Sequence, residues 1–376
     1  MVQQVPPTGL SNNRPFRNKI INGDFNIFQR SSSAVTAGNS TYTTADRWRT
    51  HISTDGAMTT EQESLSLADQ ATTGSQKAWE IKCTSTDSSI ASNQYAFVLQ
   101  SIEAQSLQDL LYGTSSAKTL TCSFWVKSSL TGTYGLFVYK GDTTSYFLPI
   151  EFSISSADTW EKKIIEISPT AGSTTLITSS GGVINNDNGE GLAIGICLAM
   201  GSNYQGTNNT WTTSSHYTTS NQANFLSNTS NNFYITSFQV EVGDDATEFE
   251  VLPHDVQLER CRRYCQQHTS ASGDYYGYGV GHAASGDLNI CHMQLYPNMR
   301  AAPTLETSST AGDFAIYSQN SGVDACDALP TINGTGDTGS GGVRLQFTAT
   351  GDITADNIHE NLSNNAVTFI RFVAEF

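Results

Sequence analysis

A polar segment in the second half of the chain contains four ring-bearing side chains without any strand periodicity. These are Tyr204, Trp211, His216 and Tyr217, and they lie among Asn, Gln, Gly, Ser and Thr. A flat ring can pack against the apolar face of a sugar while neighbouring amides and hydroxyls bond to the sugar's rim. The four residues therefore form a candidate glycan-binding site. Two other interpretations stay open: a loop held in place by its own aromatic residues, or a contact between subunits.

Three other tryptophans favour a structural role. Trp79, Trp125 and Trp160 stand in, or at the start of, runs that alternate between apolar and polar residues. Such runs are typical of β-strands, in which every second side chain points into the core. We expect these rings to pack in a core or at a strand edge.

The sequence contains none of the common catalytic motifs. It lacks a Gly-x-Ser-x-Gly elbow, a His-Glu-x-x-His pair, a Gly-x-x-x-x-Gly-Lys-Ser/Thr loop and a dinucleotide-binding fingerprint. A pair of glycosidase carboxylates stays open, because their separation is set by the fold. We expect a protein that is not an enzyme.

A second cluster of reactive side chains follows Pro253, where spacing predicts a helix over 254–268. Leu258, Cys261, Cys265 and His268 recur at three, four and three residues, with Tyr264 beside them. Cysteine and histidine could bind a soft metal here, but a fourth ligand is lacking and core packing is favoured. We expect Leu258, Cys261, Tyr264 and Cys265 to make the contact between subunits.

The charge of the chain argues against nucleic acid and membrane surfaces as partners. It has 19 Lys and Arg against 35 Asp and Glu, a formal net charge of −16. No Lys or Arg occurs from Ile164 to Glu259, although that span holds ten acids. Phosphate backbones and anionic lipids are bound by clustered Lys and Arg, which are lacking here.

The cysteines indicate a protein made in a reducing compartment. Seven cysteines, an odd number, are scattered through apolar runs, so buried free thiols are favoured over a disulfide framework. The first residues lack the basic and apolar regions of a signal peptide, and no apolar stretch is long enough to span a membrane. We expect synthesis in the cytoplasm without a secretory step.

Composition and periodicity predict an all-β chain. Only 14% of residues are charged, and Ser, Thr, Asn and Gly are abundant, which disfavours long helices. One short helix is expected over 102–111. Strand-like runs are expected over these ranges: 19–28, 78–84, 94–101, 118–127, 134–140, 146–154, 160–168, 192–200 and 233–242. Antiparallel runs of this kind predict a two-sheet jelly-roll sandwich over 19–252.

The remaining residues predict three further parts. Residues 1–18 are rich in Pro, Asn and Gln and are expected to form an extended N-terminal arm. The helix, within 253–269, is expected to connect the sandwich to a smaller C-terminal β domain over 270–376. That domain has strand-like runs at 276–281, 289–296, 314–318, 343–350 and 366–376.

Three sequence blocks resemble a family of bacteriophage tail-fibre and virion structural proteins. The first combines Asn18–Arg30, which contains Asn22-Gly23-Asp24-Phe25, with Ala45-Asp46-Arg47-Trp48, and the second includes Ser123-Phe124-Trp125-Val126-Lys127. The third runs from Ile235 through Glu250 to Tyr264, with an "ATxFE" pattern at Ala246–Glu250. The chain departs from the family pattern at Phe28, Arg262 and Cys265, which affects packing.

This resemblance implies a jelly-roll module similar to carbohydrate-binding modules, displayed on the outside of a virion and assembled as a homotrimer. It implies a structural calcium ion at Asp24 and packing of Trp48 within its block. The arm would bind other virion proteins, and the exposed part would bind a host polysaccharide or protein receptor. Two alternatives stay open, a head-decorating or structural fibre protein without a receptor role and a polysaccharide depolymerase.

Overall fold

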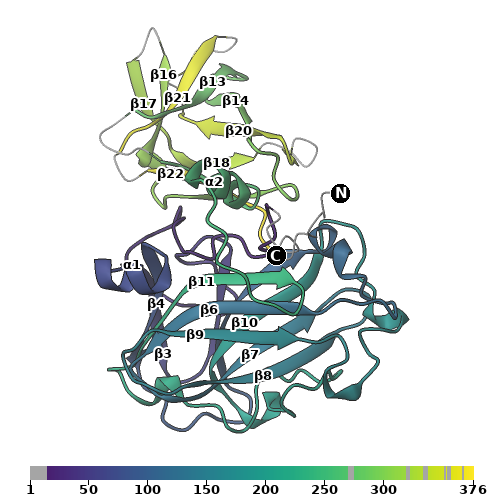
Figure 1. Cartoon of the computed structure of the whole chain (residues 1–376). Helices are drawn as coiled ribbons and strands as arrows, with labels where there is room; N and C mark the ends of the chain where they lie inside the picture. The colour runs from purple at the N-terminus through teal and green to yellow at the C-terminus, as the bar shows by residue number, and fades with distance from the viewer. Residues whose placement is uncertain are drawn as a thin grey trace, which may run out of the picture. The chain divides into compact units, whose positions relative to one another are not determined.

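The computed structural model describes residues 15–269, 275–318, 322–332, 338–350, 353, 357–365 and 368–376. It divides the chain into two compact units, the first reaching His254 and including Phe376, the second spanning Asp255–Glu375 (Figure 1). Most of the expected N-terminal arm, residues 1–14, lies outside the described residues.

The first unit contains two antiparallel sheets that enclose one large core. The strand order of the 6-stranded sheet is β1-β3-β4-β11-β6-β9, and that of the 5-stranded sheet is β2-β5-β10-β7-β8. The strands are β1 (Val35–Thr36), β2 (Trp48–Ser53), β3 (Ala57–Ser64), β4 (Lys77–Ser85), β5 (Tyr95–Glu103), β6 (Leu120–Ser128), β7 (Gly132–Lys140), β8 (Tyr146–Ile154), β9 (Glu161–Ile167), β10 (Glu190–Met200) and β11 (Asn232–Val242). The predicted jelly-roll sandwich is confirmed.

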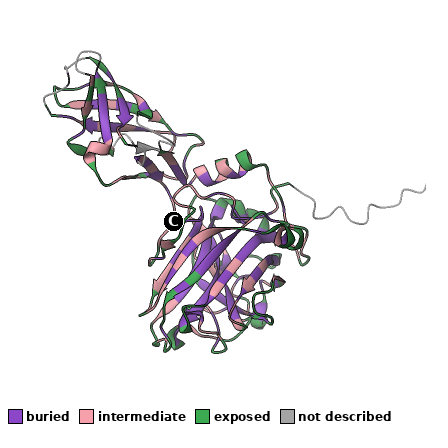
Figure 2. Ribbon diagram, turned by 90° about the vertical axis from the view of Figure 1, so that its left-hand side faces the viewer, coloured by how far each residue is buried: buried purple, intermediate pink, exposed green. Residues whose placement is uncertain are grey.

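Alternation along each strand determines which side chains reach the core between the sheets. In β6, Leu120, Cys122, Phe124 and Val126 are all buried in the same cluster. Figure 2 shows buried residues following the strands and exposed residues concentrated in the connections. The hydrophobic effect of burying these side chains is the main force that holds the two sheets together.

Eight of the expected strands of the sandwich occur within a few residues of their predicted bounds, but the first does not form. Residues 19–28 are turns and bends, with Asn22 and Phe25 at positive φ angles of 58° and 55°. The side chain of Asn22 closes this segment, donating to the carbonyl of Ile27 at 2.8 Å and accepting from its N–H at 2.9 Å. The side-chain bonds thus replace the ladder that a strand would make.

In the part of the chain that the structure describes, helix is confined to short segments. Helix α1 (Leu67–Thr73) begins at the Ser66 cap and ends at Gly74, in the left-handed conformation. The expected helix over 102–111 is the shorter 3₁₀ helix η1 (Ala104–Leu110), because Ile102 belongs to the end of β5. The other 3₁₀ helices are η2 (Ala171–Ser173), η3 (Ser180–Gly182), η4 (Ser202–Tyr204), η5 (Phe225–Ser227) and η6 (Ala311–Asp313).

The second unit is β-rich and has its own core. It contains a 3-stranded sheet, β12-β22-β15, and an 8-stranded sheet ordered β17-β16-β21-β13-β14-β20-β18, with β19 beside β20. The strands are β12 (Cys265–Thr269), β13 (Gly277–Ala283), β14 (Leu288–Gln294), β15 (Thr304–Thr307), β16 (Phe314–Ser318), β17 (Gly322–Ala325), β18 (Ala328–Ile332), β19 (Thr338–Gly339), β20 (Gly342–Thr348), β21 (Ile358–Ser363) and β22 (Phe369–Val373). Its core includes Phe314, Leu345, Phe347, Ile370 and Phe372.

The expected helix over 254–268 is wrong in its second half. Helix α2 spans His254–Arg262, and from Cys265 onward the chain is strand β12, with Cys265 opposite Val373. Pairing with the apolar strand β22 prevails over the helical spacing of the cysteines, as tertiary context often does over local pattern. Cys261 and His268 therefore do not share a helical stripe.

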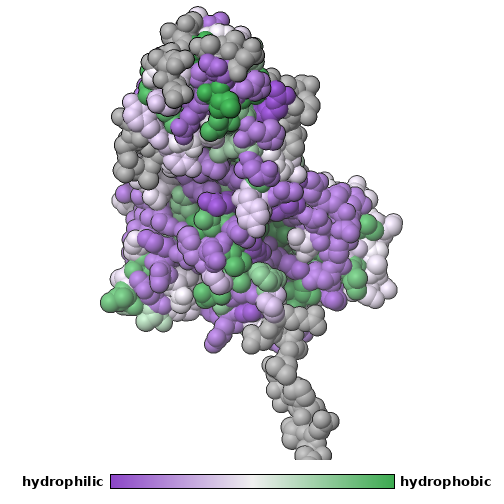
Figure 3. Space-filling view, turned by 90° about the horizontal axis from the view of Figure 1, so that it is seen from above, coloured by the Kyte–Doolittle hydropathy of each residue, from purple (hydrophilic) through white to green (hydrophobic). Residues whose placement is uncertain are grey.

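All seven cysteines are free and buried, which confirms that prediction. Among the described residues, no helix is long and apolar enough to cross a membrane. On the face seen in Figure 3, hydrophilic side chains predominate and hydrophobic ones occur in small groups. The acidic net charge of −16 suits a surface of this kind, because like-charged molecules repel one another.

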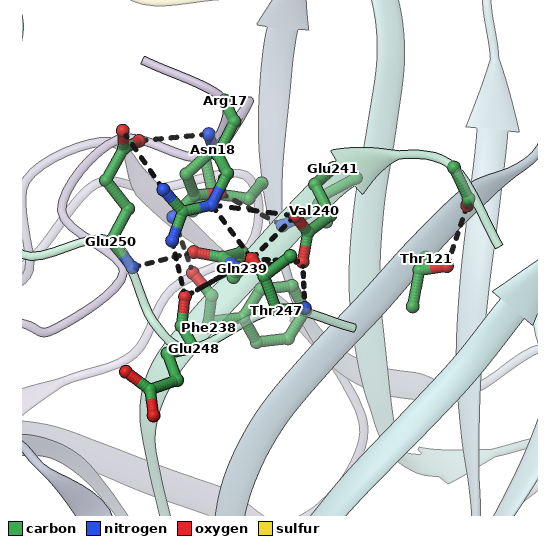
Figure 4. Close-up of polar contacts among 12 residues, drawn as sticks. Arg17, Asn18, Thr121, Phe238, Gln239, Val240, Glu241, Thr247, Glu248 and Glu250 are labelled. Carbon is green, nitrogen blue, oxygen red and sulfur yellow. Dashed lines mark hydrogen bonds and ion pairs between the residues drawn. The ribbon is translucent and has the colours of Figure 1, made fainter. Parts of the chain in front are cut away.

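The first and third sequence blocks meet in one polar network at the start of the described chain (Figure 4). Asn18 donates to the carbonyl of Phe238 at 3.1 Å, and its Oδ1 accepts from the N–H groups of Ile20 and Val240, both at 3.0 Å. Its own N–H donates to Glu250 at 3.1 Å. Asn18 thus bonds the entering chain to β11.

Arg17 and two carboxylates complete this network. Arg17 donates to Thr247 Oγ1 at 2.8 Å and lies 3.6 Å from Glu241 and 3.8 Å from Glu250. Gly23 lies beside the same strand, where a β-carbon would collide with the carbonyl oxygen of Phe238. This close approach explains the glycine of the Asn22-Gly23-Asp24 block.

Asn18→Ala is expected to lower the free energy of unfolding by about 2–4 kcal/mol, because it leaves several buried backbone groups without partners. Urea unfolding followed by circular dichroism measures this loss. Asn93→Ala, at an exposed turn position, is the matched control and should change stability by less than about 0.5 kcal/mol. Equal effects of the two variants would contradict the role assigned to Asn18.

Candidate functional site

The five-stranded sheet bears a second apolar cluster on the face turned away from the main core. Phe97 and Leu99 of β5 alternate with the core residues Ala96 and Val98, and Phe137 of β7 alternates in the same way. Ala193, Cys197 and Met200 of β10 complete the buried part of the cluster. We call this surface the aromatic face, because rings make up most of it.

Four half-buried tyrosines surround this buried floor. Tyr95 and Tyr139 come from β5 and β7, and Tyr204 and Tyr217 come from the segment between β10 and β11. Tyr217 is central: its ring lies 5.2 Å from Phe97, 5.0 Å from Phe137 and 5.3 Å from Phe147, measured between centroids. Tyr204 lies 5.5 Å from Tyr95 and 6.1 Å from Tyr217.

The structure therefore brings together two of the four residues expected from sequence. Tyr204 and Tyr217 are also joined through the backbone, since the N–H of Tyr217 donates to the carbonyl of Tyr204 at 2.9 Å. Burial raises the pKa of the Tyr217 phenol to about 12, so this hydroxyl stays protonated and can donate a hydrogen bond at neutral pH.

Gln222 attaches the segment to the sheet. Its side-chain oxygen accepts from the N–H of Gly135 and from Thr218, both at 2.9 Å, while its NH₂ donates to the carbonyl of Cys197 at 3.2 Å. A β-carbon at Gly135 would collide with Thr218. Glycine at 135 thus permits the segment to lie directly on β7.

His51 of β2 extends the aromatic face. Its ring stacks on Phe97 with centroids 4.7 Å apart and planes 7° from parallel. Burial, followed by the charge of Arg49, lowers the pKa of His51 to about 4. The imidazole is consequently neutral at physiological pH, and its Nε2 has no hydrogen-bond partner among the described residues.

Polar groups border the rings. The Tyr95 hydroxyl lies 3.5 Å from Asn39 Oδ1, and the Tyr139 hydroxyl lies 3.2 Å from Ser145 Oγ. On the edge strand β8, the Glu151 carboxylate accepts a hydrogen bond from Asn221 Nδ2 at 2.9 Å. Rings with an apolar body and hydroxyl tips, edged by amides and a carboxylate, match the two kinds of surface on a sugar.

Trp211 does not belong to this face, which corrects the expectation that its ring contacts a ligand. Its side chain is only 2% exposed and packs in the core between the sheets. The indole N–H donates to the carbonyl of Ser168 at 2.9 Å. The polar residues around Trp211 in the sequence suggested an exposed loop. Burial of a single ring depends on tertiary packing, which the local sequence does not show.

His216 is half-buried and lies against Gly206, whose hypothetical β-carbon would collide with the imidazole. It is adjacent to Tyr217 in sequence, but no ring contact joins it to the aromatic face among those found in the described residues. Its role in ligand contact stays a prediction.

Sequence reasoning missed Tyr95, Phe97, Phe137 and Tyr139, which were interpreted only as parts of strands. The signal that could have found them is the near-continuous apolar character of 95–99 and 134–139. Runs apolar on both alternating faces indicate a sheet that is covered on both sides.

The structure gives no support to a calcium ion at Asp24. Its side chain is 4% exposed and accepts from Asn26 Nδ2 at 2.6 Å. Within the described ranges, no group of three or more His, Cys, Asp or Glu side chains is placed to bind a metal. Calcium prefers six or more oxygen ligands, and the contacts of Asp24 include a side-chain amide donor.

The expected subunit contact at α2 also needs correction. Cys261, Tyr264 and Cys265 are 0–3% exposed in the single chain, so they are already packed. Leu258 alone of the four is partly exposed.

Solved structures that resemble this chain at low similarity include sugar-binding proteins and a phage domain. A candidate sugar-binding protein from Bacteroides thetaiotaomicron shares 15% identity over 60% of this chain and 100% of its own, with a TM-score of 0.34. The family 11 carbohydrate-binding module of a Clostridium thermocellum cellulase shares 13% over 54% and 91%, with a TM-score of 0.27. The enzymatically active domain of bacteriophage CBA120 tailspike protein 4 shares 10% over 61% and 22%, with a TM-score of 0.29.

No protein-family model matches the sequence, and neither does any curated protein. At these TM-scores the fold assignment rests on the sheet topology of the chain itself.

Trp211→Ala is expected to lower the free energy of unfolding of the first unit by about 3–5 kcal/mol, because it empties a large core site. Guanidinium unfolding monitored by far-ultraviolet circular dichroism gives the value. Trp160→Ala, at a half-buried position, serves as the matched control and should cost clearly less. A Trp211 variant as stable as the wild type would show that the ring is not a core anchor.

The free energy of unfolding of the protein should fall as the pH drops from about 6.5 towards 4. The pKa of His51 is about 4 in the folded protein and about 6.5 in an unfolded chain, so the unfolded chain binds more protons in this window. His51→Gln should flatten the pH dependence of the unfolding free energy relative to wild type, although His268, whose pKa is also lowered to about 4, contributes in both proteins. Urea titrations at several pH values measure both slopes, and identical slopes would contradict burial of His51.

Proposed function

We propose that this chain is a structural protein of the bacteriophage virion exterior, a tail fibre or receptor-binding component that attaches to a glycan of the host surface through the aromatic face. The observation that carries the glycan part is the set of half-buried tyrosines Tyr95, Tyr139, Tyr204 and Tyr217 above a buried aromatic floor.

The chemistry of these side chains supports a saccharide as the ligand. A tyrosine ring supplies apolar area at little conformational cost, and its hydroxyl bonds to sugar hydroxyls. The floor residues Phe97 and Phe137 are at most 5% exposed, so they support the tyrosines from below and make almost no contact with solvent. Because these side chains are already held in place, little conformational entropy is lost when a ligand binds.

The virion part of the proposal is supported by the sequence blocks. The residues of these blocks have structural roles in the fold. Asn18 bonds to Phe238 and Val240 and so joins the start of the chain to β11. Trp48 and Phe124 pack in the core. The N-terminal arm would then hold the protein to other virion proteins.

Three further points belong to this proposal. The protein acts by binding and is not an enzyme. It functions on the outside of the particle, after synthesis in the host cytoplasm. It assembles as a homotrimer, a prediction of the resemblance for which Leu258 is the one expected contact residue that is partly exposed.

The double variant Tyr95→Ala/Tyr139→Ala is expected to weaken glycan binding roughly 5- to 150-fold, because loss of two stacking rings removes about 1–3 kcal/mol. The probe is an array of purified lipopolysaccharide O-chains and capsular polysaccharides, followed by calorimetry with the polysaccharide that gives the strongest signal.

Tyr317→Ala is the matched control, since Tyr317 is an exposed tyrosine on β16 of the second unit. It should bind like the wild type. Circular dichroism establishes that each variant is folded. Unchanged binding by the folded double variant would overturn the assignment of the aromatic face, and an array without any signal would argue for the structural role without a receptor.

A further inference from the structure

Strand β9 lies at one edge of the six-stranded sheet of the first unit (Figure 1). It pairs with β6 along one side, from Leu120 opposite Ile167 to Val126 opposite Glu161. Along its other side, no backbone hydrogen bond joins β9 to any residue in the part of the chain that the structure describes. An edge of this kind presents a row of N–H and C=O groups that can pair with a further strand.

The sequence of β9 carries little of the protection that natural edge strands have against such pairing. The strand contains no proline, and its register with β6 runs without a bulge. Lysine side chains are the usual remaining protection, and β9 has two. Lys163 is already neutralised within the chain, because its ammonium group lies 2.5 Å from the Glu161 carboxylate. Lys162 has no ion-pair partner among the described residues.

Three side chains of β9 point away from the main core at a spacing of two residues. Lys162, Ile164 and Glu166 are all exposed. Ile165 and Ile167, on the opposite side of the strand, are buried in the core between the sheets. Ile164 is 60% exposed, so covering its side chain would be favourable. The outward side of the edge strand thus reads basic, apolar, acidic.

This order is complementary to itself when two copies of β9 run antiparallel. A register that places Ile164 opposite Ile164 of the second copy also places Lys162 opposite Glu166, once on each side of the centre. Apolar pairs and opposite charges directly across two strands both stabilise an antiparallel sheet. Moving the centre to Lys163 or to Ile165 would lose both Lys–Glu pairs, so the charges select one register.

We propose that β9 pairs with β9 of a second copy of this chain, so that the six-stranded sheet continues from one molecule into the next about a two-fold axis. The contact uses one strand from each copy and does not involve the aromatic face, which lies on the other sheet. A three-fold axis does not generate a two-fold contact. In a homotrimer the β9 pair therefore joins two trimers.

The first test is sedimentation equilibrium of the full chain over a range of concentrations, up to about 0.5 mM, because a contact of this size is expected to have a micromolar Kd. The mass of the particle should double as the concentration rises, from one chain to two or from three to six. A mass that stays at one chain or at three over the whole range would overturn the proposal.

Cysteine variants test the register. Residues directly opposite each other in an antiparallel pair have Cα atoms about 4.5–5.5 Å apart, which a disulfide can span. Under mild oxidation, Ile164→Cys should form a covalent dimer. Lys162→Cys alone should not, because the two copies of residue 162 lie about 13 Å apart along the strands, but a mixture of Lys162→Cys and Glu166→Cys should. The native cysteines are all buried. Cross-linking of Lys162→Cys as efficient as that of Ile164→Cys would overturn the register.

Charge exchange tests the two Lys–Glu pairs. Lys162→Glu should raise the Kd of self-association roughly tenfold, because both pairs then carry like charges. Lys162→Glu/Glu166→Lys should restore the wild-type Kd, since the opposite charges are present again. Lys82→Glu, at an exposed position of β4 three strands away, makes the same change of net charge and should leave the Kd unaltered. Equal effects of Lys162→Glu and Lys82→Glu, or no recovery in the double variant, would contradict the pairing.

Discussion

The five-stranded sheet of the first unit is apolar on both faces, and the arrangement of the whole unit follows from this. One face packs against the six-stranded sheet, where Ala96, Val98 and Leu136 contribute to the common core. The other face carries Phe97, Leu99 and Phe137, which the segment from Met200 to Asn224 partly covers. Removing such side chains from water contributes about 25 cal/mol per Å². The hydrophobic effect therefore holds the covering segment against the sheet, and its side chains Tyr204 and Tyr217 become part of the aromatic face.

The segment from Met200 to Asn224 contributes side chains to both faces of the five-stranded sheet. Trp211 enters the main core and Tyr217 lies on the aromatic face, six residues apart. The short antiparallel bridge between Phe147 and Thr212 lies between them at the edge strand β8. Tyr204 and Tyr217 are thereby fixed relative to Tyr95 and Tyr139. Rigid placement of rings is what distinguishes a binding face from loosely scattered aromatics.

The sequence was sufficient to predict most of the sandwich, because alternation sustained along a run such as Leu120–Ser128 is typical of a strand with one face in the core. It failed where tertiary contacts decide. Residues 19–28 look like a strand, but the Asn22 side chain makes the bonds that a ladder would provide. Cys265 continues a helical spacing, but its backbone pairs with Val373. The aromatic face was half predicted: Tyr204 and Tyr217 stood out in a polar segment, whereas Tyr95 and Tyr139 were concealed within regular strands.

The half-buried tyrosines are proposed to contact a saccharide, and this is the claim on which the assignment of the aromatic face depends. Hydroxyl-radical footprinting of the full chain, with and without the polysaccharide that binds best, tests it directly, because reactive tyrosine rings are protected when a sugar covers them. We expect lower oxidation of Tyr95, Tyr139 and Tyr204 in the complex, with Tyr317 unchanged. Binding that leaves these three tyrosines as reactive as in the free protein would contradict the claim.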